Sequence, residues 1–253
     1  MIIINKIKNK TPKVSIITPT FNSGRFLDET LKSIQSQTYK NYELIIIDGK
    51  STDKTLKIIN KYKNIINYCI SEKDKGIYDA FNKGMRAASG KYILVVNSDD
   101  KLMRNALQIL NKYDLRYPDI DFIFGSVRKH WGVLHGYNEK KIKYSWGFYS
   151  SHSTGFCIKR KSAKKVGEYN IRYKYHADYD YFYRMIVHHK MKGVATKKHE
   201  LFGIFRRGGF SSRASFKKKF YEEIKIRYDN KQNIFTILII VTYKLFKNFK
   251  QLI

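Results

Sequence analysis

The chain has 253 residues, of which 43% are hydrophobic and 15% aromatic, and its formal net charge is +29. This composition excludes a disordered chain and supplies enough apolar side chains for one large domain. The excess positive charge lies mainly after residue 100 and favours phosphorylated substrates, anionic lipids or nucleic acid as partners. The two cysteines, Cys69 and Cys157, favour a reducing compartment, and no segment reaches the roughly 20 apolar residues of a membrane-spanning helix. We therefore expect a cytoplasmic protein.

The first hundred residues alternate between predicted strands and predicted helices. Strands are predicted at 14–18, 43–47, 65–70 and 92–96, and helices at 25–37, 53–62 and 77–88. Thr52 or Asp53 is expected to cap the second helix. Such alternation predicts right-handed crossovers and an α/β fold, with a mostly parallel sheet flanked by helices on both faces.

Polar side chains follow each predicted strand at its carboxyl end. They include Thr18, Asp48 and Asp74, and the run at 97–100 reads Asn-Ser-Asp-Asp. Because the carboxyl ends of parallel strands share one edge of a sheet, we expect these side chains to converge on one crevice. Their oxygen atoms suit a hard divalent cation that also binds phosphate. Taken alone, the Asp99-Asp100 pair also fits a solvated loop or a helix N-cap.

The second part of the sequence is less regular. Strands are predicted at 120–127, 151–158 and 201–205, strands or a long loop at 129–149, a helix from about Asp178, and a mobile loop at 206–211. Residues 234–246 form an apolar helical run that follows Lys217, Lys218 and Lys219. This pattern predicts a helix on an anionic membrane surface, or one packed on the domain or on a partner subunit.

Several of these stretches together resemble a known family. Residues 14–22 (VSIITPTFN), 48–55 (DGKSTDKT), 71–84, 97–100 (NSDD) and 176–181 (HADYDY) resemble the family 2 glycosyltransferases of GT-A fold, in particular the branch that builds bacterial surface polysaccharides. The resemblance covers about residues 13–211. It implies a GT-A domain at 1–214, with a nucleotide-binding half at 13–101 and an acceptor half at 102–214. A basic helical extension at 215–253 would then be the membrane contact.

The resemblance implies transfer of a sugar from a nucleotide-diphosphate donor to the hydroxyl of a lipid-linked or saccharide acceptor, with inversion and with Mg²⁺ or Mn²⁺. The implied donor-site residues are Thr18, Pro19 and Asp48 at the base, Asp74 and Lys83 nearby, Asn97 and Ser98 at the nucleotide sugar, and Asp99 or Asp100 on the metal. Asn97 stands where many relatives carry an aspartate. Lys50 stands where relatives often carry a glycine. If this turn needs a positive φ, lysine is strained there; otherwise the turn differs slightly, or Lys50 reaches the donor phosphates.

Asp178 is the expected general base, because an inverting displacement needs a carboxylate facing the acceptor hydroxyl. Asp178 could instead serve only as a helix N-cap, and Asp180 is the alternative carboxylate. His152, Arg206 and Arg207 are implied contacts of the donor or the acceptor. Their alternatives are ordinary packing for the histidine and an exposed basic turn for the arginines.

Two other functions compete with glycosyl transfer. A nucleotidyltransferase would use a similar fold and metal site but would give Asp178 no role. A non-catalytic basic protein that binds nucleic acid or membrane would explain the charge, but the sequence contains no nucleic-acid-binding motif, so we expect no nucleic-acid partner. We expect an enzyme held peripherally at the inner face of the cell membrane.

Overall fold

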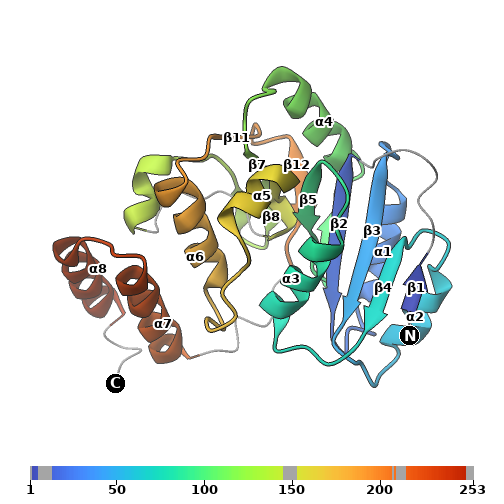
Figure 1. Ribbon diagram of the computed structural model, residues 1–253, viewed down its shortest axis with the longest axis horizontal. Helices are drawn as coiled ribbons and strands as arrows, with labels where there is room; N and C mark the ends of the chain where they lie inside the picture. Colours follow the sequence, from blue (N-terminus) through green and yellow to red (C-terminus); the bar gives the residue numbers. More distant parts are fainter. Residues whose placement is uncertain (1, 5–12, 145–152, 207, 209–214, 249–253) are drawn as a thin grey trace.

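The computed structural model describes residues 2–4, 13–144, 153–206, 208 and 215–248. An eight-stranded sheet crosses the molecule in the order β1 (Ile2–Ile4), β4 (Tyr68–Ser71), β3 (Tyr42–Asp48), β2 (Val14–Thr20), β5 (Tyr92–Val95), β10 (Phe156–Lys159), β7 (Phe122–Phe124) and β11 (Gly193–Ala195) (Figure 1). The four central strands β4, β3, β2 and β5 are parallel, as predicted. Strand β10 runs antiparallel to both of its neighbours.

Strand β2 is longer than predicted, because it continues through Pro19 to Thr20. Proline is tolerated there because β5 pairs with β2 only as far as Ile17, so the position without an N–H faces no ladder partner on that side. On its other edge β2 remains in register with β3, where Thr20 lies opposite Asp48. The pairing places Thr20 and Asp48 side by side at the carboxyl ends of their strands, where the candidate site begins.

Helices cover both faces of the sheet, and for this reason the central strands are apolar without interruption. One face packs against α3 (Ile77–Ala87), α5 (Arg160–Val166) and α6 (Ala177–Tyr183). The other face packs against α1 (Leu27–Gln35), α2 (Thr55–Lys61) and α4 (Ala106–Arg116). Successive residues of β2 show the division, since Ile16 belongs to the second cluster and Ile17 to the first. Both isoleucines are fully buried.

The predicted single strand at 120–127 is wrong, because the segment forms two strands in different sheets. Strand β7 belongs to the main sheet, whereas β8 (Ser126–Lys129) joins a small sheet in the order β6 (Lys101–Leu102), β12 (Leu201–Ile204), β8 and β9 (Gly132–Leu134). Gly125 separates the two strands. A Cβ atom at this position would lie 2.1 Å from the ring of Phe202, so only glycine permits this close approach.

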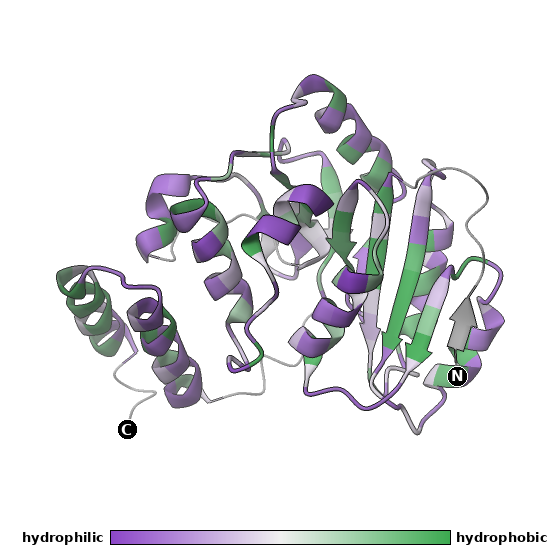
Figure 2. Ribbon diagram, viewed as in Figure 1, coloured by the Kyte–Doolittle hydropathy of each residue, from purple (hydrophilic) through white to green (hydrophobic). Residues whose placement is uncertain are grey.

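Short helical turns lie in the second half of the chain, at η1 (Glu139–Tyr144), η2 (Ser153–Gly155) and η3 (Arg184–His188, a π-helical turn). The C-terminal helices α7 (Phe216–Asp229) and α8 (Ile234–Lys247) lie at the end of the molecule opposite the N-terminus (Figure 1). Within the described residues, no helix combines the length and the hydropathy needed to cross a membrane. Helix α8 is nevertheless the most continuously hydrophobic helix at the periphery (Figure 2).

Candidate active site

Asp48, at the carboxyl end of β3, organises the first part of the site. Its side chain is fully buried and accepts hydrogen bonds from the hydroxyls of Thr20 at 3.0 Å, Ser51 at 2.5 Å and Ser71 at 2.5 Å. The backbone N–H of Ser51 donates a fourth bond at 3.0 Å. Asp48 therefore joins the ends of the three strands β2, β3 and β4 into one rigid rim.

The rim continues to the end of β5 through hydroxyl groups. The Ser23 and Ser98 hydroxyls are 2.7 Å apart, and the backbone N–H of Asn22 donates to the Ser51 hydroxyl at 2.9 Å. Asp53 accepts from the backbone N–H of Thr55 at 2.9 Å, but Lys54 occupies the N-cap position of α2, so the predicted cap by Thr52 or Asp53 is wrong. Polar groups that are far apart in the sequence thus meet at the carboxyl edge of the sheet.

The two adjacent aspartates after β5 occupy different environments. Asp100 is almost fully buried and accepts bonds from the Thr154 hydroxyl at 2.5 Å and from the backbone N–H of Arg206 at 3.1 Å. Burial raises the pKa of Asp100 to about 7. Asp99 keeps 29% of its side chain exposed, and its carboxylate lies 3.8 Å from Nε of Arg206. Burial raises the pKa of Asp99 as well, and the Arg206 charge opposes this shift.

Asn97 lies beside these carboxylates. Its amide nitrogen donates to the Ser153 hydroxyl at 2.8 Å and to Asp100 at 3.3 Å, whereas its buried Oδ1 atom has no hydrogen-bond partner. The Oδ1 atom of Asn97 and the partly exposed carboxylate of Asp99 are both oxygen ligands of the kind that hard cations bind. The described residues contain no cluster of three or more His, Cys, Asp or Glu side chains suited to a metal ion. A cation bound here would therefore depend on phosphate or water for its other ligands.

The residues expected near a nucleotide lie along the same rim. Thr18 and Pro19 are buried within β2, and the hydroxyl of Thr18 has no hydrogen-bond partner. Asp74 approaches Gly49 so closely that a Cβ atom there would lie 2.5 Å from the aspartate oxygen, and burial raises the pKa of Asp74. Lys83 forms ion pairs with Glu72 at 2.7 Å and Asp79 at 3.6 Å. These ion pairs hold the lysine ammonium between the segment that follows β4 and the first turn of α3.

Phe21 is an aromatic side chain at this rim that the sequence analysis did not single out. It is 63% exposed, and its ring lies 3.3 Å from the position that a Cβ on Gly49 would take. Exposure of a phenylalanine between two polar strand ends is unusual for a soluble domain and provides a flat surface for stacking. In the sequence, the position of Phe21 within the turn at 20–23, directly after the strand, could have identified it as a residue of the site.

Asp178 lies in the first turn of α6. Its carboxylate accepts from its neighbour Tyr179 N–H at 2.9 Å and lies 3.5 Å from the hydroxyl of Tyr78 on α3. Burial and the Asp178 charge raise the pKa of Tyr78 well above its usual value, so this hydroxyl remains a donor. Asp180 points elsewhere, as expected from its position on the helix, because it is buried and bonded to Arg184 and Asn230.

Lys129 on β8 is a further charged residue of the crevice that sequence reasoning did not identify. Burial lowers its pKa, while the negative charges of Asp100 and Asp178 oppose that shift, so its ammonium lies within electrostatic reach of both carboxylates. Its Nζ atom lies 4.8 Å from the ring centre of Phe205, directly before Arg206. Arg206 itself stacks on Phe26 at 3.3 Å. No local sequence pattern indicates these contacts, since they join residues that are far apart in the sequence.

His152 and Arg207 lie outside the described residues, so their expected contacts stay predictions. Arg206 is described, and it touches both aspartates of the NSDD run through its backbone and its side chain. The rim therefore brings together Asp48, Ser98, Asp99 and Arg206. Tyr78 on α3 lies beside Asp178, and the charges of Asp100 and Asp178 both act on Lys129.

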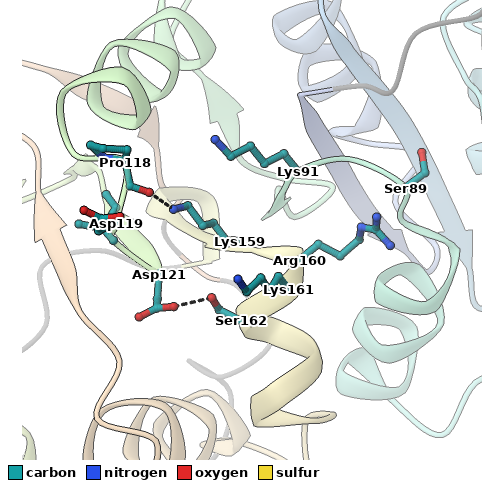
Figure 3. Close-up of a pocket in the computed structure, with 10 residues that line it drawn as sticks. Ser89, Lys91, Pro118, Asp119, Asp121, Lys159, Arg160, Lys161 and Ser162 are labelled. Carbon is teal, nitrogen blue, oxygen red and sulfur yellow. Dashed lines mark hydrogen bonds between the residues drawn. The ribbon is translucent and has the colours of Figure 1, made fainter.

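A separate cavity of about 560 Å³ opens at the other edge of the sheet, before β5 and at the start of α5 (Figure 3). Its lysines and arginine are mostly engaged with the protein, since Lys159 donates to the carbonyl of Pro118 and Arg160 to that of Gly90. Asp121 accepts from Ser162 at 2.6 Å (Figure 3). This cavity lies at the amino end of β5, away from the carboxyl-end crevice.

Comparison with known proteins agrees with this arrangement. Residues 15–200 match the family model described as Glycosyl transferase family 2. The chain is 33% identical over 181 residues to the "PGL/p-HBAD biosynthesis glycosyltransferase Rv2957" of Mycobacterium tuberculosis, a match covering 67% of this chain and 68% of the relative.

Two solved structures share the fold. The S. aureus TarS 1–349 complex with UDP-GlcNAc has a TM-score of 0.66 and 19% identity, over 85% of this chain and 66% of the TarS 1–349 chain. The mannosyltransferase PcManGT from Pyrobaculum calidifontis, in complex with GDP-Man and Mn²⁺, has a TM-score of 0.64 and 15% identity, over 89% of this chain and 66% of that one. The family match spans the strand-end crevice and α6 together. The chain belongs to family 2 of the glycosyltransferases.

Proposed function

We propose that this glycosyltransferase moves a sugar from a nucleotide-diphosphate donor to an acceptor hydroxyl with inversion, using Asp178 as the general base. The observations that support this proposal are the carboxylates gathered at the carboxyl ends of the parallel strands and the separate carboxylate of Asp178, which the Tyr179 N–H orients at the start of α6. The oxygen-rich rim around Asp99 faces the donor, and Asp178 faces the acceptor. An inverting displacement needs this separation of roles.

Asp99, rather than Asp100, is the proposed ligand of the metal ion. Asp99 is partly exposed, whereas both oxygens of Asp100 already accept hydrogen bonds from the protein. The unpaired Oδ1 of Asn97 supplies a second oxygen. When bound here, Mg²⁺ or Mn²⁺ would neutralise the charge that develops on the leaving diphosphate. Arg206 and Lys129 contribute positive charge beside the same position.

The nucleotide is proposed to lie along the ends of β2 and β3. The exposed ring of Phe21 offers a stacking surface for the base, and Thr18, Pro19 and Asp74 border it. Asp48 acts by holding Ser51 and Ser71 in place, since all four of its bonds are internal. Ser98 and Asn97 would contact the ribose, and Lys83 stands at the edge of the nucleotide site.

Asp178 is proposed to take the proton of the acceptor hydroxyl as the new glycosidic bond forms. Its carboxylate is only half-buried and is oriented by the Tyr179 N–H, with the Tyr78 hydroxyl beside it. Proximity of the two substrates then supplies much of the acceleration. A nucleotidyltransferase, the competing enzyme, would leave this oriented carboxylate without a role.

The acceptor is proposed to be a lipid-linked or saccharide intermediate of a bacterial surface polysaccharide, reached at the cytoplasmic face of the membrane. Support comes from α8, whose outer side chains are large, apolar and exposed, namely Phe235, Leu238, Ile239, Tyr243 and Phe246. Helices with one uncovered apolar face bind at membrane interfaces.

The charges of α7 and α8 fit an anionic surface. Of the three acidic side chains between residues 215 and 248, Glu222 and Glu223 are buried and bonded to the domain or to neighbouring cations, and Asp229 accepts from the hydroxyl of Tyr173. The exposed lysines of this segment lie at positions 217, 218, 225, 231 and 247, and the ammonium of Lys247 also lies 5.7 Å from the ring centre of Tyr243. Lysines near a membrane surface attract anionic headgroups.

The central experiment is incubation with UDP-, GDP- and dTDP-sugars, starting with UDP-GlcNAc and GDP-mannose, in the presence of Mn²⁺. Release of nucleoside diphosphate, abolished by Asp178→Asn while donor binding survives, supports the proposal. Release of pyrophosphate would instead assign the chain to nucleotidyl transfer. Near-normal turnover by Asp178→Asn would place the general base elsewhere.

A further inference from the structure

We propose that Glu222 on α7 is a positioning residue for Asp178, so that the C-terminal helix sets the geometry of the general base. The inference rests on the proposed function of Asp178 and adds a residue to it. Glu222 lies outside all of the sequence motifs and 44 positions after the aspartate that it would control. The two residues are joined through the backbone that leads into α6.

The carboxylate of Glu222 is bonded to three successive backbone N–H groups. Its Oε2 accepts from Lys174 N–H at 2.6 Å, and its Oε1 accepts from Tyr175 N–H at 2.6 Å and His176 N–H at 2.7 Å. Three consecutive amides that point toward one anion form a concave site of fixed backbone shape. The fixed segment ends one residue before α6 begins at Ala177.

Burial makes this interaction strong. Glu222 is only 9% exposed, so its bonds to the amides are made away from water. The nearest cationic candidate is the imidazole of His176, 3.9 Å from Oε1. Backbone donors, rather than a lysine or arginine, therefore satisfy this carboxylate. Such an arrangement fixes the position of a loop more precisely than an ion pair between flexible side chains.

The opposite side of the same loop is held by α3. The hydroxyl of Tyr78 lies 3.3 Å from the carbonyl of Tyr175 and 3.5 Å from Oδ1 of Asp178. Tyr78 is itself stacked on Tyr169. The segment 174–178 is thus held between Tyr78, from the nucleotide-binding half, and Glu222, from the C-terminal helix. Small shifts of a general base cost large factors in rate, so this clamp acts on turnover rather than on donor affinity.

Helix α7 is anchored independently of Glu222. Arg227, which is fully buried, donates to the carbonyl of Lys143 and to Glu223, and Asn230 donates to Asp180 at 2.8 Å. Replacement of Glu222 therefore leaves other contacts that keep the helix docked. Glu223 is the matched control, because it is similarly buried on the same helix but bonds to Arg227 and Lys244 instead of the loop.

The test compares Glu222→Gln, Glu222→Asp and Glu223→Gln in the full chain by two measurements. The first is UDP-GlcNAc hydrolysis with Mn²⁺, in which water replaces the acceptor. We expect Glu222→Gln to lower kcat at least tenfold and to change KM for the donor less than twofold. Glu222→Asp should give an intermediate kcat, and Glu223→Gln should leave both constants unchanged. The double variant Asp178→Asn/Glu222→Gln should turn over no more slowly than Asp178→Asn, since Glu222 acts through Asp178.

The second measurement is amide hydrogen exchange, which requires no substrate. Exchange at residues 174–176 should be faster in Glu222→Gln and unchanged in Glu223→Gln. An unchanged kcat, a rise in donor KM parallel to the loss of kcat, or unaltered exchange would each overturn the proposal. Absence of donor turnover in the wild-type protein would instead count against the proposed function, while the exchange result would still decide whether Glu222 braces the loop.

Discussion

The backbone N–H of Arg206 donates to Oδ1 of Asp100 at 3.1 Å, which ties the loop after β12 to the end of β5. The second oxygen of Asp100 is occupied by the Thr154 hydroxyl. Asp100 therefore acts as a structural link between the two sheets at the crevice. Its neighbour Asp99, which is partly exposed, is left as the proposed ligand of the metal ion.

This division predicts different outcomes for the two aspartates. Asp99→Asn should raise the Mn²⁺ concentration needed for half-maximal activity at least tenfold and leave thermal stability unchanged, because its side chain is partly exposed. Asp100→Ala should lower stability by about 2 kcal/mol, because the Thr154 hydroxyl and the Arg206 N–H lose a buried acceptor. Metal titration and thermal unfolding of both variants would check this, and equal metal dependence in both would refute the assignment.

Lys50 adopts φ = +66°, so the turn after β3 has the geometry for which relatives use glycine. Lys50→Gly should raise the free energy of unfolding by about 1 kcal/mol, since a side chain is strained in this region. Lys231→Gly is the control, because Lys231 has φ = +54° far from the crevice. If only Lys50→Gly also raises donor KM, the lysine contacts the donor phosphates. If its stability does not rise, the turn carries no strain.

Asp114 provides a test of stability at acidic pH. Burial opposes its ionisation, but hydrogen bonds from Lys13, Lys91 and Tyr92 outweigh burial and lower its pKa to about 2. At pH values above the unfolded-state pKa of 3.8, a carboxyl group with a lowered pKa in the folded protein stabilises the fold. This contribution disappears as the pH falls through about 2.

Asp114→Asn should therefore be about 2 kcal/mol less stable than the wild type at pH 6, and the difference should vanish near pH 2. Urea unfolding over this pH range would measure it. Asp119→Asn, at an exposed carboxylate nearby, should show no such trend. A constant difference between wild type and Asp114→Asn at all pH values would mean that packing rather than charge is lost.

The proposed membrane contact predicts a change in vesicle binding. Phe235→Glu/Ile239→Glu should reduce cosedimentation with phosphatidylglycerol vesicles at least tenfold, because both side chains lie on the uncovered side of α8. Leu115→Glu is the matched control, since Leu115 and Phe235 are each 72% exposed. Raised salt should weaken wild-type binding. If the wild type instead forms a dimer and binds no vesicles, and the double variant is monomeric, this face of α8 contacts a second copy of the chain.

The strand–helix alternation of the first hundred residues was predictable because each buried strand is an unbroken apolar run. The convergence of Asp48, Ser98 and Asp99 followed from the parallel topology alone. The division at Gly125 was not predictable, because it depends on the ring of Phe202, which comes from a strand 77 positions later. Helix α4 was missed although Leu107, Leu110 and Tyr113 recur at helical spacing.

The contacts around Asp178 show the limit of local patterns most clearly. The position of Asp178 at a helix start was visible in the sequence, and so was the divergence of Asp180. Lys129 and Glu222 were not visible, because each acts through groups on distant elements. Backbone N–H groups donate hydrogen bonds whatever the side chains of the loop are. The sequence of the loop therefore does not indicate that it binds Glu222.

The bond between Glu222 and the loop at 174–176 also imposes an order on biosynthesis. A nascent chain that has emerged from the ribosome through HADYDY contains all of the stretches that resemble the family, but it still lacks α7, which carries Glu222. It also lacks Arg206, whose backbone N–H binds Asp100. Both sides of the proposed site are therefore completed only after the last of these stretches has been made.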